Sequence, residues 1–174
     1  MTTGSLGLLA VDRLTATRVW GALPPDVRAE AARAVYGRDR EDPAARRLAD
    51  AAIAAALRFR EVAVQKLPVE RRVAHLARLP HPDESLASSL LLALHLGGRR
   101  AMLAAFLDAL GIAHEDGVIR DAAHLEPPSA EALSSACSVL FRRFPRDDVE
   151  IYLASLLALD PETWRGLRKG PGLH

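Results

Sequence analysis

The sequence contains few of the residues from which reactive sites are built. Its single cysteine, Cys137, excludes an intrachain disulfide and a zinc site made of cysteines. Aromatic residues make up only 5% of the 174 residues. No run of four or more β-branched residues alternates with polar ones, so there is no sign of a sheet. These absences favour an all-α protein and leave its function open.

Long apolar runs are also missing. The most apolar stretch, residues 86–110, is interrupted by His95 and by Gly97-Gly98-Arg99-Arg100, so neither half reaches the roughly 20 residues of a membrane-spanning helix. Residues 1–22 lack the basic start and the cleavage site of a secretory signal. We therefore expect a cytoplasmic protein that does not bind membranes.

Charge is nearly balanced overall but is unevenly distributed. The net charge of +1 produces no global field that would recruit nucleic acid. Residues 1–80 carry an excess of five positive charges, and residues 81–174 an excess of four negative ones. Only Lys66 and Lys169 are lysines among 23 basic residues. This excess of arginine is typical of GC-rich bacterial genomes; the alternative is selection of arginine for two-pronged contacts to carboxylate or phosphate.

Helical periodicity is present in block after block. Ala and Leu, both strong helix formers, dominate the apolar residues, and Pro, Gly and Asp mark the joints. We expect about seven to nine helices over roughly 65–75% of the chain. They should pack as one compact irregular bundle, a single domain over residues 1–164 with a flexible basic tail over 165–174. A short solenoid of helical repeats is the alternative, although the two helix–Pro–helix pairs do not align.

The longest helix is expected over residues 43–66, behind an N-cap at Asp42. Asp83 and Ser129 should cap two further helices, and Gly111 should end one. Segments 51–57 and 86–96 are apolar on nearly every side, so the core should centre on them. Four residues from later helices should join it: Leu133, Phe141, Tyr152 and Leu156.

Residues 50–72 have a second interpretation, as a helix-turn-helix that binds DNA. Counted from Asp50, the apolar and alanine positions of that motif are matched by Ile53, Ala54, Leu57, Val64 and Leu67. Arg58 stands where the motif needs glycine, which is a serious departure. Five basic residues would then hold phosphates: Arg58, Arg60, Lys66, Arg71 and Arg72. The simpler interpretation is one long helix with solvated arginines.

The long connection over residues 111–128 is the place where a metal would bind. Two imidazoles and four carboxylates fall within it: His114, Glu115, Asp116, Asp121, His124 and Glu126. Such groups ligate zinc, manganese or non-haem iron. Neither Glu-x-x-His nor His-x-x-x-His occurs in the chain, however, and a solvated polar loop is the simpler interpretation. A metal site in residues 111–126 is thus a second alternative, and no cofactor is predicted.

Arg99 and Arg100 follow two glycines at an expected helix start, where backbone N–H groups and two cations would hold a phosphate or carboxylate. The competing interpretation is a plain hinge at Gly97-Gly98. His95, one turn earlier, is expected to be a structural histidine. No Ser–His–Asp or Cys–His arrangement has local support in the sequence.

Together these patterns predict a non-enzymatic protein that binds another protein or a second copy of itself, with nucleic acid a less favoured partner. The predicted interface consists of Arg58, Arg60, Arg71 and Arg72. Arginine is enriched among the residues that dominate binding energy. We expect these four side chains to be solvated.

Overall fold

Helices make up nearly all of the regular structure. The computed structural model describes residues 7–11, 13–37 and 42–169, and helices account for 71% of them. Nine α-helices lie within these ranges, with three short 3-10 helices and one small antiparallel hairpin. The all-α prediction is confirmed, and the number of helices falls at the upper end of the predicted range.

The chain divides into two compact units. The first, called here the α1–α6 unit, spans residues 16–98; the second, the α7–α9 unit, combines residues 1–15 with residues 99–174. Each contains fully buried large side chains, such as Trp20 and Ile53 in the first and Phe106 and Ile151 in the second. The prediction of one domain over residues 1–164 stays a prediction.

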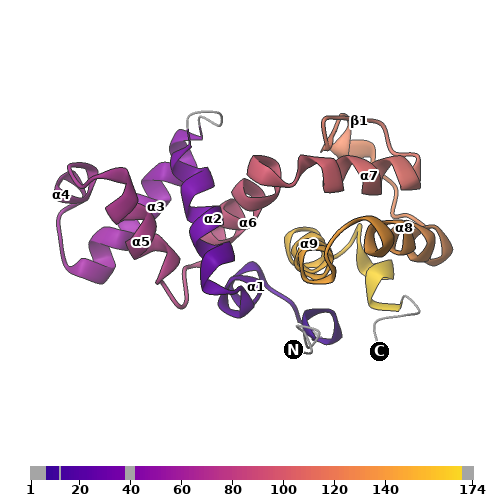
Figure 1. The fold of residues 1–174 in the computed structure, drawn as a ribbon, viewed down its shortest axis with the longest axis horizontal. Coiled ribbons are helices and arrows are strands. Elements are labelled where there is room, and N and C mark those ends of the chain that lie inside the picture. Colours follow the sequence, from indigo (N-terminus) through magenta and orange to yellow (C-terminus); the bar gives the residue numbers. More distant parts are fainter. Residues whose placement is uncertain (1–6, 12, 38–41, 170–174) are drawn as a thin grey trace. The chain divides into compact units, whose positions relative to one another are not determined.

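The α1–α6 unit is built around α2. Its helices are α1 (Ala16–Ala22), α2 (Pro25–Tyr36), α3 (Pro43–Leu57), α4 (Glu61–Gln65), α5 (Val69–Ala77) and α6 (Glu84–Gly98). Figure 1 shows α2 running between α5 and α6, and it packs against both. The side chains that α6 buries include Leu86, Leu90 and Leu94, so the expected core segment 86–96 is confirmed.

Gly97 and Gly98 allow α6 to lie close to α2. A Cβ on Gly97 would stand 3.0 Å from the Cβ of Ala34, and one on Gly98 would stand 3.1 Å from Oε1 of Glu30. Both glycines belong to the last turn of α6. The break comes instead at Arg99, whose φ of −121° and ψ of 20° depart from helical values. The expected break between two helices is therefore present and falls one residue after the glycines, while close helix packing explains the glycines themselves.

The helix N-caps predicted at Asp42, Asp83 and Ser129 are confirmed. The Asp42 carboxylate accepts hydrogen bonds from the backbone of Ala44 and Ala45 at the start of α3. Asp83 accepts from the Leu86 N–H at 2.8 Å, and Ser129 Oγ accepts from the Ala132 N–H at 3.2 Å. These short polar side chains satisfy N–H groups that have no partner within the helix.

Segment 51–57 is not the deep core that was expected. Ile53 and Ala54 are buried, but Ala55 and Ala56 are exposed. Among the four residues expected to join the core, Leu133 and Tyr152 are buried, whereas Phe141 and Leu156 are half-buried. Apolar composition on every side does not bury a helix on every side when neighbours cover only one of its faces.

The α7–α9 unit encloses a cluster of aromatic rings. Its elements are η1 (Leu8–Ala10), α7 (Arg100–Leu110), β1 (His114–Glu115), β2 (Val118–Ile119), η2 (Ala122–His124), α8 (Ala130–Arg143), α9 (Arg146–Leu159) and η3 (Arg165–Lys169). The Phe106 ring meets Tyr152 edge-on with centroids 5.5 Å apart, and it lies 5.7 Å from Trp164. The hairpin lies against α7 (Figure 1).

Residues 165–174 were expected to form a flexible tail, but the first part of this segment is structured. Residues 165–169 form η3, which packs against α8 and buries Leu167. Gly166 permits this approach, because a Cβ there would stand 2.5 Å from Cδ1 of Leu133. Residues 170–174 lie outside the described residues.

Within the described ranges, no single helix is both long and apolar enough to span a membrane. Helices α6 and α7 meet those criteria only when they are taken together across their break.

Leu90→Ala should lower the free energy of unfolding by about 2–5 kcal/mol, because Leu90 is fully buried and its removal leaves a cavity. The matched control is Leu92→Ala on the same helix, where the side chain is 42% exposed and the cost should stay within about 0.5 kcal/mol. Urea titration followed by circular dichroism measures both. Similar losses for the two variants would show that this face of α6 is not the core.

Gly117→Ala should destabilise the protein more than Gly111→Ala. Both glycines have positive φ, 81° and 68°, which costs alanine about 1–2 kcal/mol. At Gly117 the added Cβ would also stand 2.7 Å from the Cβ of Leu103, whereas at Gly111 nothing lies within 4 Å. Overpacking adds about 1–3 kcal/mol. Equal midpoints of thermal unfolding for the two variants would contradict this packing of the hairpin on α7.

Candidate functional site

The stretch predicted as one helix over residues 43–66 is broken. Helix α3 ends at Leu57, and Arg58 takes the left-handed conformation with φ 56° and ψ 38°. The Phe59 N–H donates to the carbonyl of Ala54 at 2.9 Å, which closes the end of the helix. Helix α4 then begins at Glu61. The single-helix expectation is wrong, because the chain turns at the residue that stands in the glycine position of the helix-turn-helix pattern.

The second helix of this pair is short. Helix α4 has only five residues, little more than one turn. A recognition helix places three or four side chains on base edges in the major groove. The exposed residues of α4 include the acidic Glu61 and the apolar Val62. The turn resembles the predicted motif, whereas the length and side chains of α4 do not suit DNA.

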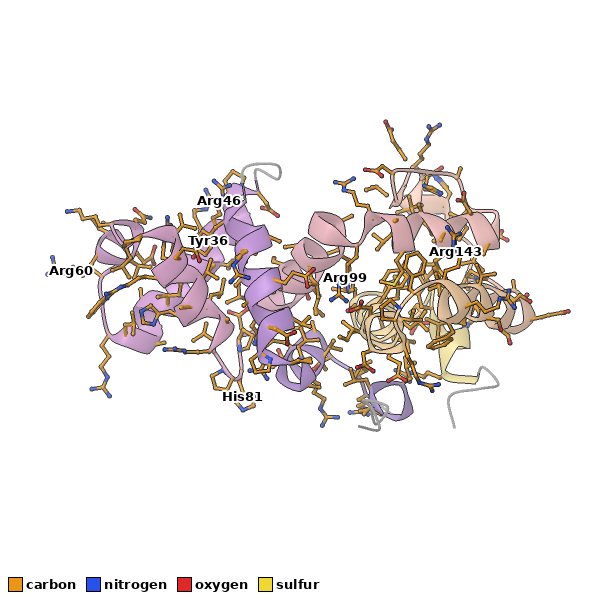
Figure 2. All side chains as sticks on the ribbon, in the orientation of Figure 1. Tyr36, Arg46, Arg60, His81, Arg99 and Arg143 are labelled. Atoms are coloured by element: carbon orange, nitrogen blue, oxygen red, sulfur yellow. The ribbon has the colours of Figure 1, made fainter. Side chains whose placement is uncertain are left out.

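Three of the four predicted interface arginines are exposed. Arg58 and Arg60 lie in the connection between α3 and α4, and Arg71 lies in the first turn of α5. Figure 2 shows Arg60 projecting away from the helices. Their role as an interface stays a prediction. Arg72 differs, because its side chain is only 16% exposed, so the expectation that it is solvated is wrong.

Arg72 belongs to a buried polar cluster that joins three helices. Its guanidinium lies 3.4 Å from the Asp50 carboxylate and 4.7 Å from the centre of the Tyr36 ring. The Tyr36 hydroxyl donates to Asp50 Oδ1 at 2.7 Å. Arg46, which lies near Tyr36 in Figure 2, donates to the carbonyls of Val35 and Gly37. These contacts connect α2, α3 and α5, so Arg72 has a structural role.

The electrostatics of this cluster keep Tyr36 protonated. Burial, the hydrogen bond to Asp50 and the charge of Asp50 together raise the pKa of Tyr36 far above its ordinary value. The phenol therefore remains a hydrogen-bond donor throughout the physiological range. A buried carboxylate between a donor and a cation holds helices together and offers no open group to a substrate.

The outward side of α3 is apolar. Its exposed and half-exposed residues include six that we call the α3 apolar face: Ala44, Leu48, Ala51, Ala52, Ala55 and Ala56. Arg47 is the only charged residue of this helix that is exposed rather than half-buried or buried. A surface helix normally carries polar side chains on its outer side. Here both sides are apolar, and the described residues cover only one of them.

Exposed large apolar side chains concentrate in the same region. Six occur among the described residues, and four of them fall between residues 48 and 69: Leu48, Phe59, Val62 and Val69. Phe59 and Val62 are 53% and 62% exposed. Sequence reasoning missed this surface, because it placed segment 51–57 in the core. The apolar pattern on all sides of segment 51–57 could have indicated this surface. Such a pattern indicates that the helix is packed on several sides, either by its own chain or by a partner.

Arg99 and Arg100, predicted to bind an anion, each have a carboxylate partner. Nη2 of Arg99 lies 3.0 Å from Asp148, and Nη1 of Arg100 lies 2.9 Å from Asp116. The Arg99 side chain is also largely buried. Because both cations are engaged inside their own unit, the anion site at this helix start gains no support.

The metal alternative gains no support either. His114 Nε2 lies 3.1 Å from Asp108, while His124 Nδ1 lies 2.8 Å from Asp121, so the two imidazoles have different partners. No group of three or more His, Cys, Asp or Glu side chains that could hold a metal occurs in the described part of the chain. Residues 114–119 form a hairpin instead, with Asp116 and Gly117 at its turn.

The Asp108–His114 pair resembles part of a catalytic dyad, but both ring nitrogens of His114 already have hydrogen-bond partners in the structure. The backbone N–H of Gly117 donates to Nδ1 of His114 at 3.2 Å. That nitrogen therefore cannot accept a proton from a substrate without losing the turn. An open hollow of about 410 Å³ lies beside the hairpin, and its lining mixes both charge signs around Arg100 and Asp116. It selects no class of ligand.

Burial affects two further side chains that could otherwise take part in a reaction, Cys137 and His95. Burial raises the pKa of the Cys137 thiol to about 11, so it is protonated at neutral pH and is a poor nucleophile. His95 is buried, with only 4% of its surface exposed. These positions agree with a structural thiol and a structural histidine.

Similarity to other proteins does not identify the function. Comparison of the chain with protein-family models, with curated proteins and with solved structures finds no match in any of the three. The function must therefore be inferred from the protein's own surface.

Asp50→Ala should lower the free energy of unfolding by about 3–5 kcal/mol, because it leaves the charge of Arg72 largely buried without its carboxylate. Arg71→Ala, at the exposed neighbouring position, is the matched control and should change stability by no more than about 0.5 kcal/mol. Chemical denaturation compares the two. A loss below about 1 kcal/mol for Asp50→Ala would mean that the ion pair does not hold these helices together.

Proposed function

We propose that this protein is a non-enzymatic docking domain that binds another protein through its α1–α6 unit. The observation that carries the proposal is the α3 apolar face, six apolar residues on the outward side of one helix. Contiguous exposed apolar surface of this kind marks interaction sites in soluble proteins.

The distribution of apolar and charged side chains supports the proposal. Exposed Phe59 and Val62 follow the α3 apolar face along the chain, and the exposed cations Arg58 and Arg60 are their neighbours in the sequence. Protein interfaces combine a central apolar region with a polar rim, and arginine is enriched in them. Arg71 extends the exposed cations to α5. Arg72 is left out of the interface because it is bound to Asp50.

Nucleic acid is a less favoured partner for the same surface. The left-handed turn at Arg58 supports a helix–turn–helix backbone. DNA-binding surfaces, however, are dominated by cations that contact phosphates. Here the centre of the surface is apolar, and Glu61 is exposed at the start of α4. A gel-shift titration tests this alternative directly.

Leu48→Glu combined with Ala52→Glu should abolish partner binding and leave the fold intact, because both side chains lie on the outward side of α3. The matched control is Leu92→Glu, at a position of similar exposure on α6. Crosslinking in cells, followed by purification and mass spectrometry, compares the captured proteins. We expect the control to keep the partners of the unaltered protein and the double variant to lose them. Capture of the same proteins by both variants would refute the proposal.

A further inference from the structure

We infer that the partner segment is an acidic amphipathic helix of another protein, which lies along α3. This inference rests on the proposed function and specifies the chemistry of the partner. It depends on three observations: the spacing of the apolar residues on α3, the sign of the charges around them, and the identity of residue 58.

The spacing favours a helix. Leu48, Ala52 and Ala55 follow one another at intervals of four and three residues, which is the seam along which two helices pack. Alanine side chains between larger ones let a second helix approach closely. From Ala44 to Ala56 the face extends about 18 Å at 1.5 Å per residue, which corresponds to three turns of a partner helix. Leu48 is the one large side chain of the face, and the exposed Phe59 follows the end of α3 in the sequence.

The charges favour an acidic partner. Between residues 44 and 67, four cations are exposed: Arg47, Arg58, Arg60 and Lys66. Glu61 is the only exposed carboxylate in that segment, since Asp50 is buried and bound to Arg72. Charges at the rim of an interface select partners of opposite sign and accelerate association. Carboxylates on the partner helix would match these exposed cations.

The same charges disfavour a second copy of this chain. In a symmetric dimer the same surface meets itself, so the four cations of one copy would face those of the other. A lipid surface is also a poor match, because helices that bind membranes insert large side chains such as Trp, Phe and Leu. Five of the six residues on the α3 apolar face are alanines.

Arg58 adds an independent argument. It occupies a left-handed conformation that glycine adopts without strain and that costs other residues free energy. No hydrogen bond or ion pair joins its guanidinium to a described residue. The guanidinium therefore makes no polar contact within the described residues that offsets the cost. A strained residue with an exposed cation beside an apolar surface is accounted for by a contact with a partner.

Three matched peptides test the inference. Each is a labelled helix of about 18 residues with the same Leu/Ala seam, flanked by Glu, by Gln or by Lys. Fluorescence anisotropy with the full chain should show the Glu peptide binding at least about tenfold more tightly than the other two, with an affinity that falls as salt is added. Ala52→Glu should weaken this binding at least about tenfold, and Leu92→Glu should leave it unchanged.

Arg58→Gly provides the sharpest variant. Removal of the strain should raise the melting temperature, whereas loss of the cation should weaken binding of the Glu peptide severalfold. A residue with a purely structural role would not move stability and affinity in opposite directions. Unchanged affinity in this variant would remove Arg58 from the interface.

The remaining outcomes separate this inference from the proposed function. Equal binding of the three peptides would overturn the acidic partner. If none of the three peptides binds, but the Leu48/Ala52 double variant still loses its cellular partners, the partner segment is not a helix of this kind. The proposed docking function would then still hold. A dimer that Ala52→Glu dissociates, sedimentation with anionic vesicles, or a salt-dependent DNA shift would each assign the surface to a different occupant and overturn the inference.

Discussion

The buried carboxylate of Asp50 determines which side of α3 faces the interior. Segment 51–57 is apolar all round, so hydrophobic burial alone distinguishes weakly between a face with Ile53 and a face with Leu48. Asp50 is the buried charged residue of α3, and Arg46 adds hydrogen bonds to the carbonyls of Val35 and Gly37, so the two faces differ in their polar contacts. A carboxylate is costly to bury unless its partners are in place, and Tyr36 and Arg72 supply them in one rotational setting of the helix. The exposed position of Leu48, Ala52 and Ala55 follows from that setting.

This arrangement separates stability from binding on a single helix. The inward side of α3 carries the packing of Ile53 and the polar cluster, and the outward side carries alanines that stabilise the helix by propensity alone. Substitutions on the outward side are therefore tolerated by the fold, and that side can be shaped by a partner. Arg58 ends the helix at a small cost in stability and directs the chain into α4.

The sequence predicts the helices and their caps well, because these depend on local chemistry. Asp42, Asp83 and Ser129 need only the next few backbone N–H groups to act as caps. The contacts of Asp50 could not be predicted in this way, since its partner Arg72 is 22 positions away. The prediction that segment 51–57 is deeply buried failed for a related reason. An all-apolar pattern indicates that other residues should pack against the helix, but it does not say how many of them belong to the same chain. The Asp116-Gly117 hairpin carried a local signal, since that dipeptide favours the observed turn.

Pairing distinguishes the exposed cations Arg58 and Arg60 from the two arginines that were predicted to bind an anion, Arg99 and Arg100. In the α7–α9 unit, Arg99, Arg100 and Arg146 each have a carboxylate partner within the unit. A cation already paired must lose that partner before it binds another group, so such residues gain little from a ligand. Arg58 and Arg60 are exposed and therefore hydrated in the free protein. At the rim of an interface they remain partly hydrated when a partner binds. An apolar face bordered by such cations can bind a partner without the loss of any contact that holds the fold.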